Sequence, residues 1–137
     1  MTNGIRLLLA ACAVAAMPAL AASWEELRRN DEQRLAIDPA SVKKAGDEVS
    51  FTYLVDFRKL QGDYMGQYRS ATVKAKVRCK PKTMALVETE AWSEAQAQGV
   101  SLVTLKPTPE EASFRKVEAR TSDEDLYNRV CAAPKKK

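Results

Sequence analysis

The stretch YRSATVKAKVRCKPK, residues Tyr68 to Lys82, gives the strongest indication of how this chain folds. Between Ala71 and Val77, small apolar residues alternate with polar and basic ones, which is the pattern of a β-strand with one buried face. Cys79 falls on the apolar parity, so its thiol is expected to point toward the core rather than toward solvent. The stretch therefore predicts a strand with an apolar inner face, a basic outer face and a cysteine at its end.

The basic side chains of this stretch from Lys74 onward, which we call the basic stripe, are the candidate binding residues of the chain. One hypothesis is that they form a docking surface for an acidic partner or an anionic glycan. The other is that they form an ordinary solvated strand face, whose charges discourage edge-to-edge aggregation. The basic stripe consists of Lys74, Lys76, Arg78, Lys80 and Lys82.

Further strands are predicted on both sides of this stretch. In DEVSFTYLVDFR, residues 47–58, apolar side chains occupy alternate positions with one exception, which predicts a long strand with one buried face. The following KLQGDYMGQ, residues 59–67, has two glycines and no sustained period, so a loop is expected there. Residues 83–92 and 101–105 are rich in residues that favour strands. The central part of the chain thus predicts a sheet of consecutive strands.

Two segments allow alternative interpretations. In Trp24 to Asp38, residue propensity favours a helix, whereas the Asn30-Asp31 turn signal favours a hairpin of two short strands. Residues 114–118 fit either a last short strand or the end of a helix that begins at Pro109.

The last predicted element is a helix that begins after Thr121. Thr121 and Glu124 have the spacing of a capping box, and acidic residues fill the first turn, where the helix dipole favours negative charge. Leu126, Val130 and Cys131 follow at spacings that place them on one apolar face. Cys131 is therefore expected to face the core from a C-terminal helix.

The first 21 residues are predicted to be a signal peptide, which leaves residues 22–137 as one domain without a transmembrane segment. Arg6 precedes an apolar run of 14 residues, shorter than the roughly 20 that a membrane span needs, and an A-L-A cleavage motif follows. The preferred location is the periplasm. The alternative is an outer-membrane lipoprotein, because Leu9-Ala10-Ala11-Cys12 also fits a lipobox whose Cys12 would be acylated.

Removal of a signal peptide leaves two cysteines, Cys79 and Cys131. Two cysteines in an exported chain are most simply explained by one disulfide bond. A zinc site is disfavoured because the chain has no histidine, and a redox-active pair is disfavoured because C-x-x-C spacing is absent. No metal and no other cofactor is expected.

An enzyme is not expected either. Without histidine the chain has no Ser-His-Asp or Cys-His arrangement, and its glycines do not form a phosphate-binding loop. A paired-carboxylate hydrolase is the remaining catalytic alternative. The net charge of +4 allows weak attraction to anionic surfaces, but it is too small to indicate a nucleic-acid partner.

The order of these landmarks resembles the surface-adhesin protein E-like family. The shared landmarks are a signal peptide, Trp24, the Ile-Asp-x-x-Ser-Val element at residues 37–42, a long strand, Tyr68-Arg69-Ser70 leading to Val77-x-Cys79-Lys80, and a Ser122-initiated helix ending in Val130-Cys131. The resemblance spans nearly the whole of residues 22–137.

The resemblance implies an α+β fold: a single antiparallel sheet of about six strands, with a C-terminal helix packed on one face and held by a Cys79–Cys131 disulfide. It also favours the hairpin for residues 24–38. The founding member is a dimeric lipoprotein adhesin of a Gram-negative bacterium that binds host matrix and serum proteins. A host matrix protein, if the chain is surface exposed, and a homodimer are therefore implied as partners.

The function expected from all of this is a non-catalytic exported protein of the cell envelope. It would be an adhesin-like or periplasmic interaction module that binds a protein or an anionic surface, with no nucleic acid involved. The alternative is a periplasmic inhibitor or accessory protein that binds an envelope enzyme. A net positive charge is poorly suited to steering the chain onto a basic lysozyme, which weakens that example of the alternative.

Overall fold

The structure, a computed structural model, describes residues 23–63 and 66–132. The predicted signal peptide, residues 1–21, and the lipobox cysteine Cys12 lie outside the described residues. Among the described residues no helix is both long enough and apolar enough to span a bilayer.

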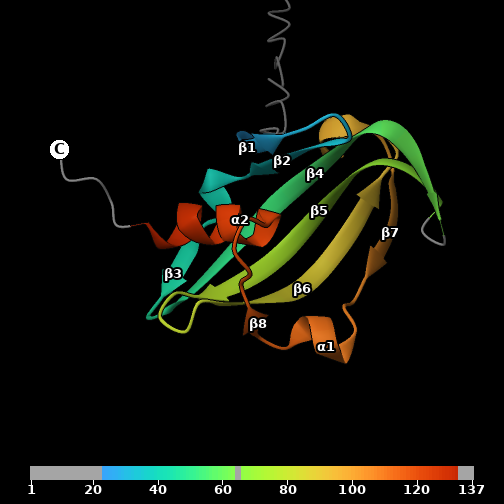
Figure 1. Cartoon of the computed structure of the whole chain (residues 1–137). Helices are drawn as coiled ribbons and strands as arrows, with labels where there is room; N and C mark the ends of the chain where they lie inside the picture. Colours follow the sequence, from blue (N-terminus) through green and yellow to red (C-terminus); the bar gives the residue numbers. More distant parts are fainter. Residues whose placement is uncertain (1–22, 64–65, 133–137) are drawn as a thin grey trace, which may run out of the picture.

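The described chain is a twisted antiparallel sheet with one main helix, α2, across one of its faces (Figure 1). The strands follow the order β1-β2-β4-β5-β6-β7, while the short strands β3 and β8 pair with β4 and β6. This arrangement confirms the expected α+β fold, with two short strands added to the expected six. The strands are β1 Glu25–Arg29, β2 Gln33–Ile37, β3 Lys43–Ala45, β4 Glu48–Asp63, β5 Gly66–Arg78, β6 Thr83–Trp92, β7 Ser101–Leu105 and β8 Arg115–Lys116; the helices are η1 Pro39–Ser41, η2 Ala95–Ala97, α1 Pro109–Ala112 and α2 Ser122–Cys131.

Strand β5 has the two faces that its alternating sequence predicts. Ala71, Val73, Ala75 and Val77 are buried, and each of them lies opposite an inward residue of β4 in the antiparallel register. The small alanines leave room for bulkier partners, such as Phe51 opposite Ala75. We call this apolar side of the sheet, which α2 covers, the inner face, and the opposite side the outer face.

The prediction of a loop for residues 59–67 is wrong. Strand β4 continues to Asp63 and β5 begins at Gly66, with paired residues up to the end of both strands. A register shift between Asp56 and Gln61 breaks the alternation, and the residues beyond it are mostly exposed, so no period marks them as strand. Gly66, the first residue of β5, has a left-handed backbone at φ +96, which glycine adopts without strain.

The segment before β3 forms the hairpin that the family resemblance favours. The side chain of Asn30 accepts hydrogen bonds from the backbone N–H groups of Glu32 and Gln33, at 2.8 and 2.9 Å. This turn folds β1 back onto β2, because an Asn side chain can replace a backbone acceptor in a turn. Of the two interpretations of residues 114–118, the short strand is confirmed: a helix does begin at Pro109, but it ends at Ala112, and β8 follows.

Helix α2 begins at the expected cap and covers the core of the inner face. The Thr121 hydroxyl accepts a hydrogen bond from the backbone N–H of Glu124, and three acidic residues occupy the first turn. Leu126 is fully buried and Val130 is 7% exposed, against the inner faces of β2, β4 and β5. The apolar spacing read from the sequence therefore identifies the buried side of this helix.

A disulfide bond joins the end of β5 to the end of α2. Cys79 and Cys131 are bonded with their Cα atoms 5.7 Å apart, a usual separation for this bond. Beside it, the hydroxyl of Tyr127 donates a hydrogen bond to the carbonyl oxygen of Cys79 at 2.6 Å. The helix is thus fixed to the sheet by a covalent bond and by a side-chain hydrogen bond at the same place.

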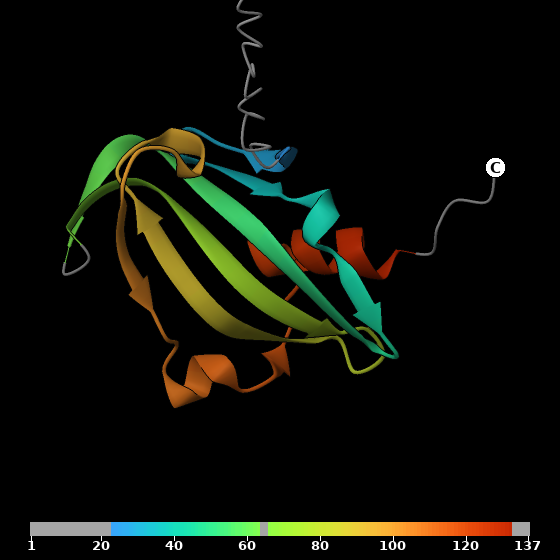
Figure 2. The same cartoon turned by 180° about the vertical axis from the view of Figure 1, so that it is seen from behind.

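Part of the outer face is also buried, because η2 folds over it. Ser70, at 0% exposure, donates its hydroxyl hydrogen to the carbonyl oxygen of Glu94 at 2.6 Å and accepts from the backbone N–H of Ala97 at 3.0 Å. Figure 2 shows η2 at one end of the long strands, while the other end of the outer face is left open.

Candidate functional site

The open end of the outer face carries three members of the basic stripe. Lys74, Lys76 and Arg78 project from alternate positions of β5, and their side chains are 63, 44 and 50% exposed. Alternate residues of a strand are spaced about 6.6 to 6.8 Å apart, so the three cations form a regular row. Helix α2 lies on the opposite side of the sheet (Figure 2).

Ion pairs across the strands position these cations without covering them. Lys74 lies 3.3 Å from the carboxylate of Glu88, and Glu48 lies 3.4 Å from Lys76 and 3.8 Å from Arg78. Exposed pairs of this kind stabilise a fold by about 0 to 1 kcal/mol. An acidic ligand could therefore replace a carboxylate partner here at little cost in free energy.

The other two members of the basic stripe lie elsewhere. Lys80 occupies the turn after β5, where its backbone N–H faces the carboxylate of Asp47. Lys82 has a left-handed backbone at φ 52, and its ammonium group donates to Glu124 of α2 at 2.9 Å and lies 5.2 Å from the ring centroid of Tyr127. Lys82 thus helps to hold the helix, and the structure gathers three of the five predicted residues into one row.

Two shallow hollows of about 390 and 560 Å³ run beside this row and share Lys76 and Val87. We call the two hollows together the groove. Phe114, which follows α1, forms part of the wall, and the guanidinium of Arg78 stacks 3.8 Å above its ring. Val87 is 41% exposed and gives the groove an apolar patch. The charged residues that line the groove are Lys43, Lys74, Lys76, Arg78, Lys106, Asp38 and Glu48.

A second hollow, missed by the sequence analysis, lies at the other end of the outer face. It has a volume of about 400 Å³ and is lined by arginines from four different strands or their ends. These arginines are scattered in the sequence without a period, so only the strand register brings them together. They are Arg29, Arg34, Arg58 and Arg69, and we call the hollow that they line the arginine hollow.

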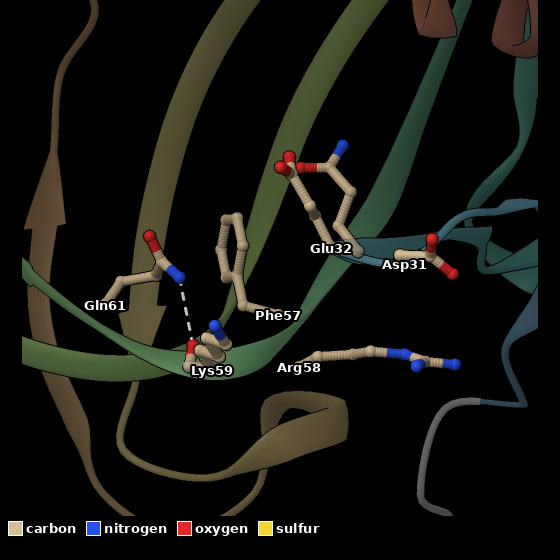
Figure 3. Close-up of a pocket in the computed structure, with 7 residues that line it drawn as sticks. Asp31, Glu32, Phe57, Arg58, Lys59 and Gln61 are labelled. Carbon is tan, nitrogen blue, oxygen red and sulfur yellow. Dashed lines mark hydrogen bonds between the residues drawn. The ribbon is translucent and has the colours of Figure 1, made fainter.

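A hollow of about 500 Å³ adjoins the arginine hollow and shares Gln33, Phe57 and Arg58 with it. Figure 3 shows this adjoining hollow: the side chain of Arg58 extends away from the ring of Phe57, and Gln61 donates a hydrogen bond to the backbone carbonyl of Lys59. Asp31 and Glu32 come from the β1–β2 turn, so this adjoining hollow carries charges of both signs.

Cations lower the pKa of two described carboxylates, Glu124 and Glu26. The hydrogen bond from Lys82, supported by the backbone N–H of Arg120, lowers the pKa of Glu124 below its usual value. The hydrogen bond from Arg29 and the nearby Arg34 lower the pKa of Glu26. On the inner face, burial raises the pKa of Tyr53, and Asp123 and Glu111 raise it further. Within residues 23–63 and 66–132, no three potential metal-binding side chains are grouped together.

The fold and its surfaces define a class of protein: a small disulfide-bonded α+β domain with an apolar face sealed by one helix and an open, cationic face. The chain belongs to the surface-adhesin protein E family, whose model matches residues 24–132. The family resemblance drawn from the sequence is thereby confirmed. No curated protein matches the sequence.

Solved structures with the same fold are those of protein E from Haemophilus influenzae. One is 19% identical, with a TM-score of 0.61, and the match covers 80% of this chain and 83% of that chain. Crystal form II of the same protein gives 17% identity, a TM-score of 0.59, and coverage of 77% and 91%. Protein E from a non-typeable strain gives 18% identity, a TM-score of 0.58, and coverage of 78% and 75%. At these identities the structures show a shared fold.

Proposed function

We propose that the chain is a non-catalytic exported protein of the cell envelope that works as an adhesin-like interaction module. The observation that carries this proposal is the division of the sheet: the inner face is occupied by α2, whereas the row of Lys74, Lys76 and Arg78 faces outward beside an open groove. Membership of the surface-adhesin protein E family supports the same function.

The partner that fits this groove is a protein surface that presents carboxylates around an apolar residue. Carboxylates would replace Glu48 and Glu88 as partners of the basic row, and the apolar residue would contact Val87 and the ring of Phe114. A purely anionic polymer would use the cations but leave this apolar patch unfilled. Protein recognition therefore uses more of the groove than a glycan or a phospholipid surface would.

A charge-matched pair of variants tests the proposal. Lys74→Ala/Lys76→Ala/Arg78→Ala removes three positive charges from the groove, and Lys44→Ala/Lys59→Ala/Arg115→Ala removes three from exposed positions outside it. Binding to vitronectin and to immobilised heparin is measured by surface plasmon resonance at two salt concentrations. We expect the first variant to bind vitronectin at least tenfold more weakly and the second to bind like the wild type. Equal losses in both variants, or none in the first, would contradict a specific groove.

Export is part of the proposal and has its own test. We infer cleavage after residue 21, which places the domain of residues 22–137 in the periplasm or on the cell surface. Mass spectrometry of the protein from soluble and membrane fractions measures the mature N-terminus. A diacylglyceryl group on Cys12 would overturn this cleavage and establish the lipoprotein alternative.

A further inference from the structure

The arginine hollow at the η2 end of the outer face has the features of a binding site for one oxyanion. The Asn30 turn brings the ends of β1 and β2 beside the bend in β4, and Arg69 of β5 completes the ring. Four guanidinium groups thereby line a hollow of about 400 Å³. Arginine is the side chain best suited to bind phosphate or carboxylate oxygens, because its planar fork can donate two parallel hydrogen bonds.

Internal carboxylates neutralise only half of this charge. Glu26 pairs with Arg29 at 2.8 Å and with Arg34 at 2.9 Å, and Asp56 pairs with Arg34 at 3.0 Å. Four arginines less these two carboxylates leave two positive charges, on Arg58 and Arg69. None of the ion pairs among the described residues includes Arg58 or Arg69.

The two remaining arginines are held in different ways. The Nε of Arg69 donates to the backbone carbonyl of Phe57 at 3.3 Å, which fixes the side chain and leaves its terminal nitrogens available. Arg58 is exposed and lines both adjoining hollows, and its side chain extends away from the ring of Phe57 (Figure 3). One guanidinium is thus fixed and the other can close over a ligand.

The far wall of the hollow is a loop with an unusual backbone conformation. Gln96 and Ala97 are consecutive residues with left-handed backbones, at φ 59 and φ 57. Asp56 accepts a hydrogen bond from the backbone N–H of Gln96 at 2.6 Å, and buried Ser70 accepts one from Ala97 at 3.0 Å. Such conformations persist only where the surroundings hold them, and they concentrate at functional sites.

The charge balance selects the class of ligand. A phosphate monoester carries about −1.5 to −2 charges at neutral pH, which matches the two free arginines better than a single carboxylate does. Asp31 and Glu32 in the adjoining hollow would repel a long polyanion, so a compact anionic group fits best. We propose that this hollow binds a single phosphate monoester group, with Arg58 and Arg69 as its direct ligands. This site is separate from the basic row of the proposed function.

The test is calorimetric titration of the purified, oxidised full chain with methyl phosphate at low ionic strength. We expect saturable binding that weakens at least tenfold in Arg58→Ala and in Arg69→Ala. Arg58→Lys keeps the charge but loses the fork, so it should also weaken binding. The control Arg115→Ala removes an exposed arginine outside the hollow and should bind methyl phosphate like the wild type.

Several results would overturn the proposal: no binding by the wild type, equal binding by Arg58→Ala, or acetate bound as tightly as methyl phosphate. Loss of binding in Lys74→Ala/Lys76→Ala/Arg78→Ala alone would move the site to the basic row. Because Arg58 is exposed, its variants should keep the wild-type melting temperature, and Arg58→Ala alone decides the outcome if Arg69→Ala fails to fold.

Recruitment to phosphatidic acid vesicles that depends on Arg58 would identify a lipid headgroup as the source of the phosphate; binding of methyl phosphate without recruitment would identify soluble phosphate esters.

Discussion

The two faces of β5 carry residues of the same strand in strict alternation, yet they have opposite roles. Val73 and Val77 on the inner face are buried under α2, whereas Lys74 and Lys76 between them remain accessible on the outer face. Substitutions one position apart should therefore change different properties, stability on one face and binding on the other. The predictions below test that separation, from the largest effect on stability to the smallest.

Breaking the disulfide should have the largest effect. In the chain-entropy model, a bond that closes a loop with a sequence separation of 52 stabilises the fold by about 4 kcal/mol. Reduction, or Cys79→Ser, should lower the melting temperature strongly, because α2 is then held only by its packing and by non-covalent contacts such as the Tyr127 hydrogen bond and the Lys82–Glu124 pair. Differential scanning calorimetry with and without reductant measures this, and an unchanged melting temperature would contradict it.

Truncating the centre of α2 should come next. Leu126→Ala removes a fully buried side chain from the inner face and should cost about 2 to 5 kcal/mol of unfolding free energy. The control Leu60→Ala, at a position that is 53% exposed, should change the free energy by less than about 0.5 kcal/mol. Urea unfolding followed by circular dichroism compares the two, and similar costs would mean that α2 does not seal the core.

Ser70 is the exception that sharpens the comparison, since it belongs to the outer face but is buried under η2. Ser70→Ala leaves the carbonyl of Glu94 and the N–H of Ala97 without this partner and should cost about 1 to 3 kcal/mol. Ser50→Ala, at a half-buried position of the same face, is the control and should be nearly neutral. Equal urea midpoints for both variants would show that η2 is not held by Ser70.

Acid should weaken the attachment of α2 through Glu124. Its pKa is lowered in the folded chain from an ordinary value of 4.5, so its contribution to stability is complete above pH 4.5 and is lost as the pH falls through the folded value. Glu124→Gln should remove part of the pH dependence of the urea midpoint as the pH falls below 4.5. A slope identical to that of the wild type would contradict this role of the Lys82–Glu124 pair.

The smallest change in stability is expected on the open face. Lys74→Ala/Lys76→Ala removes two exposed ion pairs and should alter the unfolding free energy by less than about 1 kcal/mol for each pair. The same variant should still weaken partner binding, which surface plasmon resonance measures. A large loss of stability here would show that the two faces are not independent.

Local patterns predicted the parts of this fold in which burial follows the sequence period. The alternation of β5, the capping residues of α2 and the pairing of Cys79 with Cys131 were all accessible in this way. The extension of β4 and β5 across residues 59–67 was not, because an exposed ribbon beyond a register shift has no buried face to impose a period.

The surfaces were less accessible than the core because they depend on register and turn geometry. The left-handed backbone of Lys82 turns its side chain toward α2, which strand parity alone does not reveal. The arginine hollow depends on which residues face each other between β2 and β4, such as Arg34 and Asp56. The Asn30 turn and the acidic and basic residues beside it were visible in the sequence as a signal for this hollow. Only the strand register, however, brings Arg58 and Arg69 next to them.

The disulfide also fixes the order in which the protein can be completed. The segment between Cys79 and Cys131 contains β6, β7, β8 and both α-helices, so a chain delivered N-terminus first exposes the apolar sides of β4 and β5 before their cover arrives. Until Cys131 follows, Cys79 is an unpaired thiol beside an uncovered sheet. Correct maturation therefore depends on protecting that thiol and that surface for as long as the intervening segment takes to arrive.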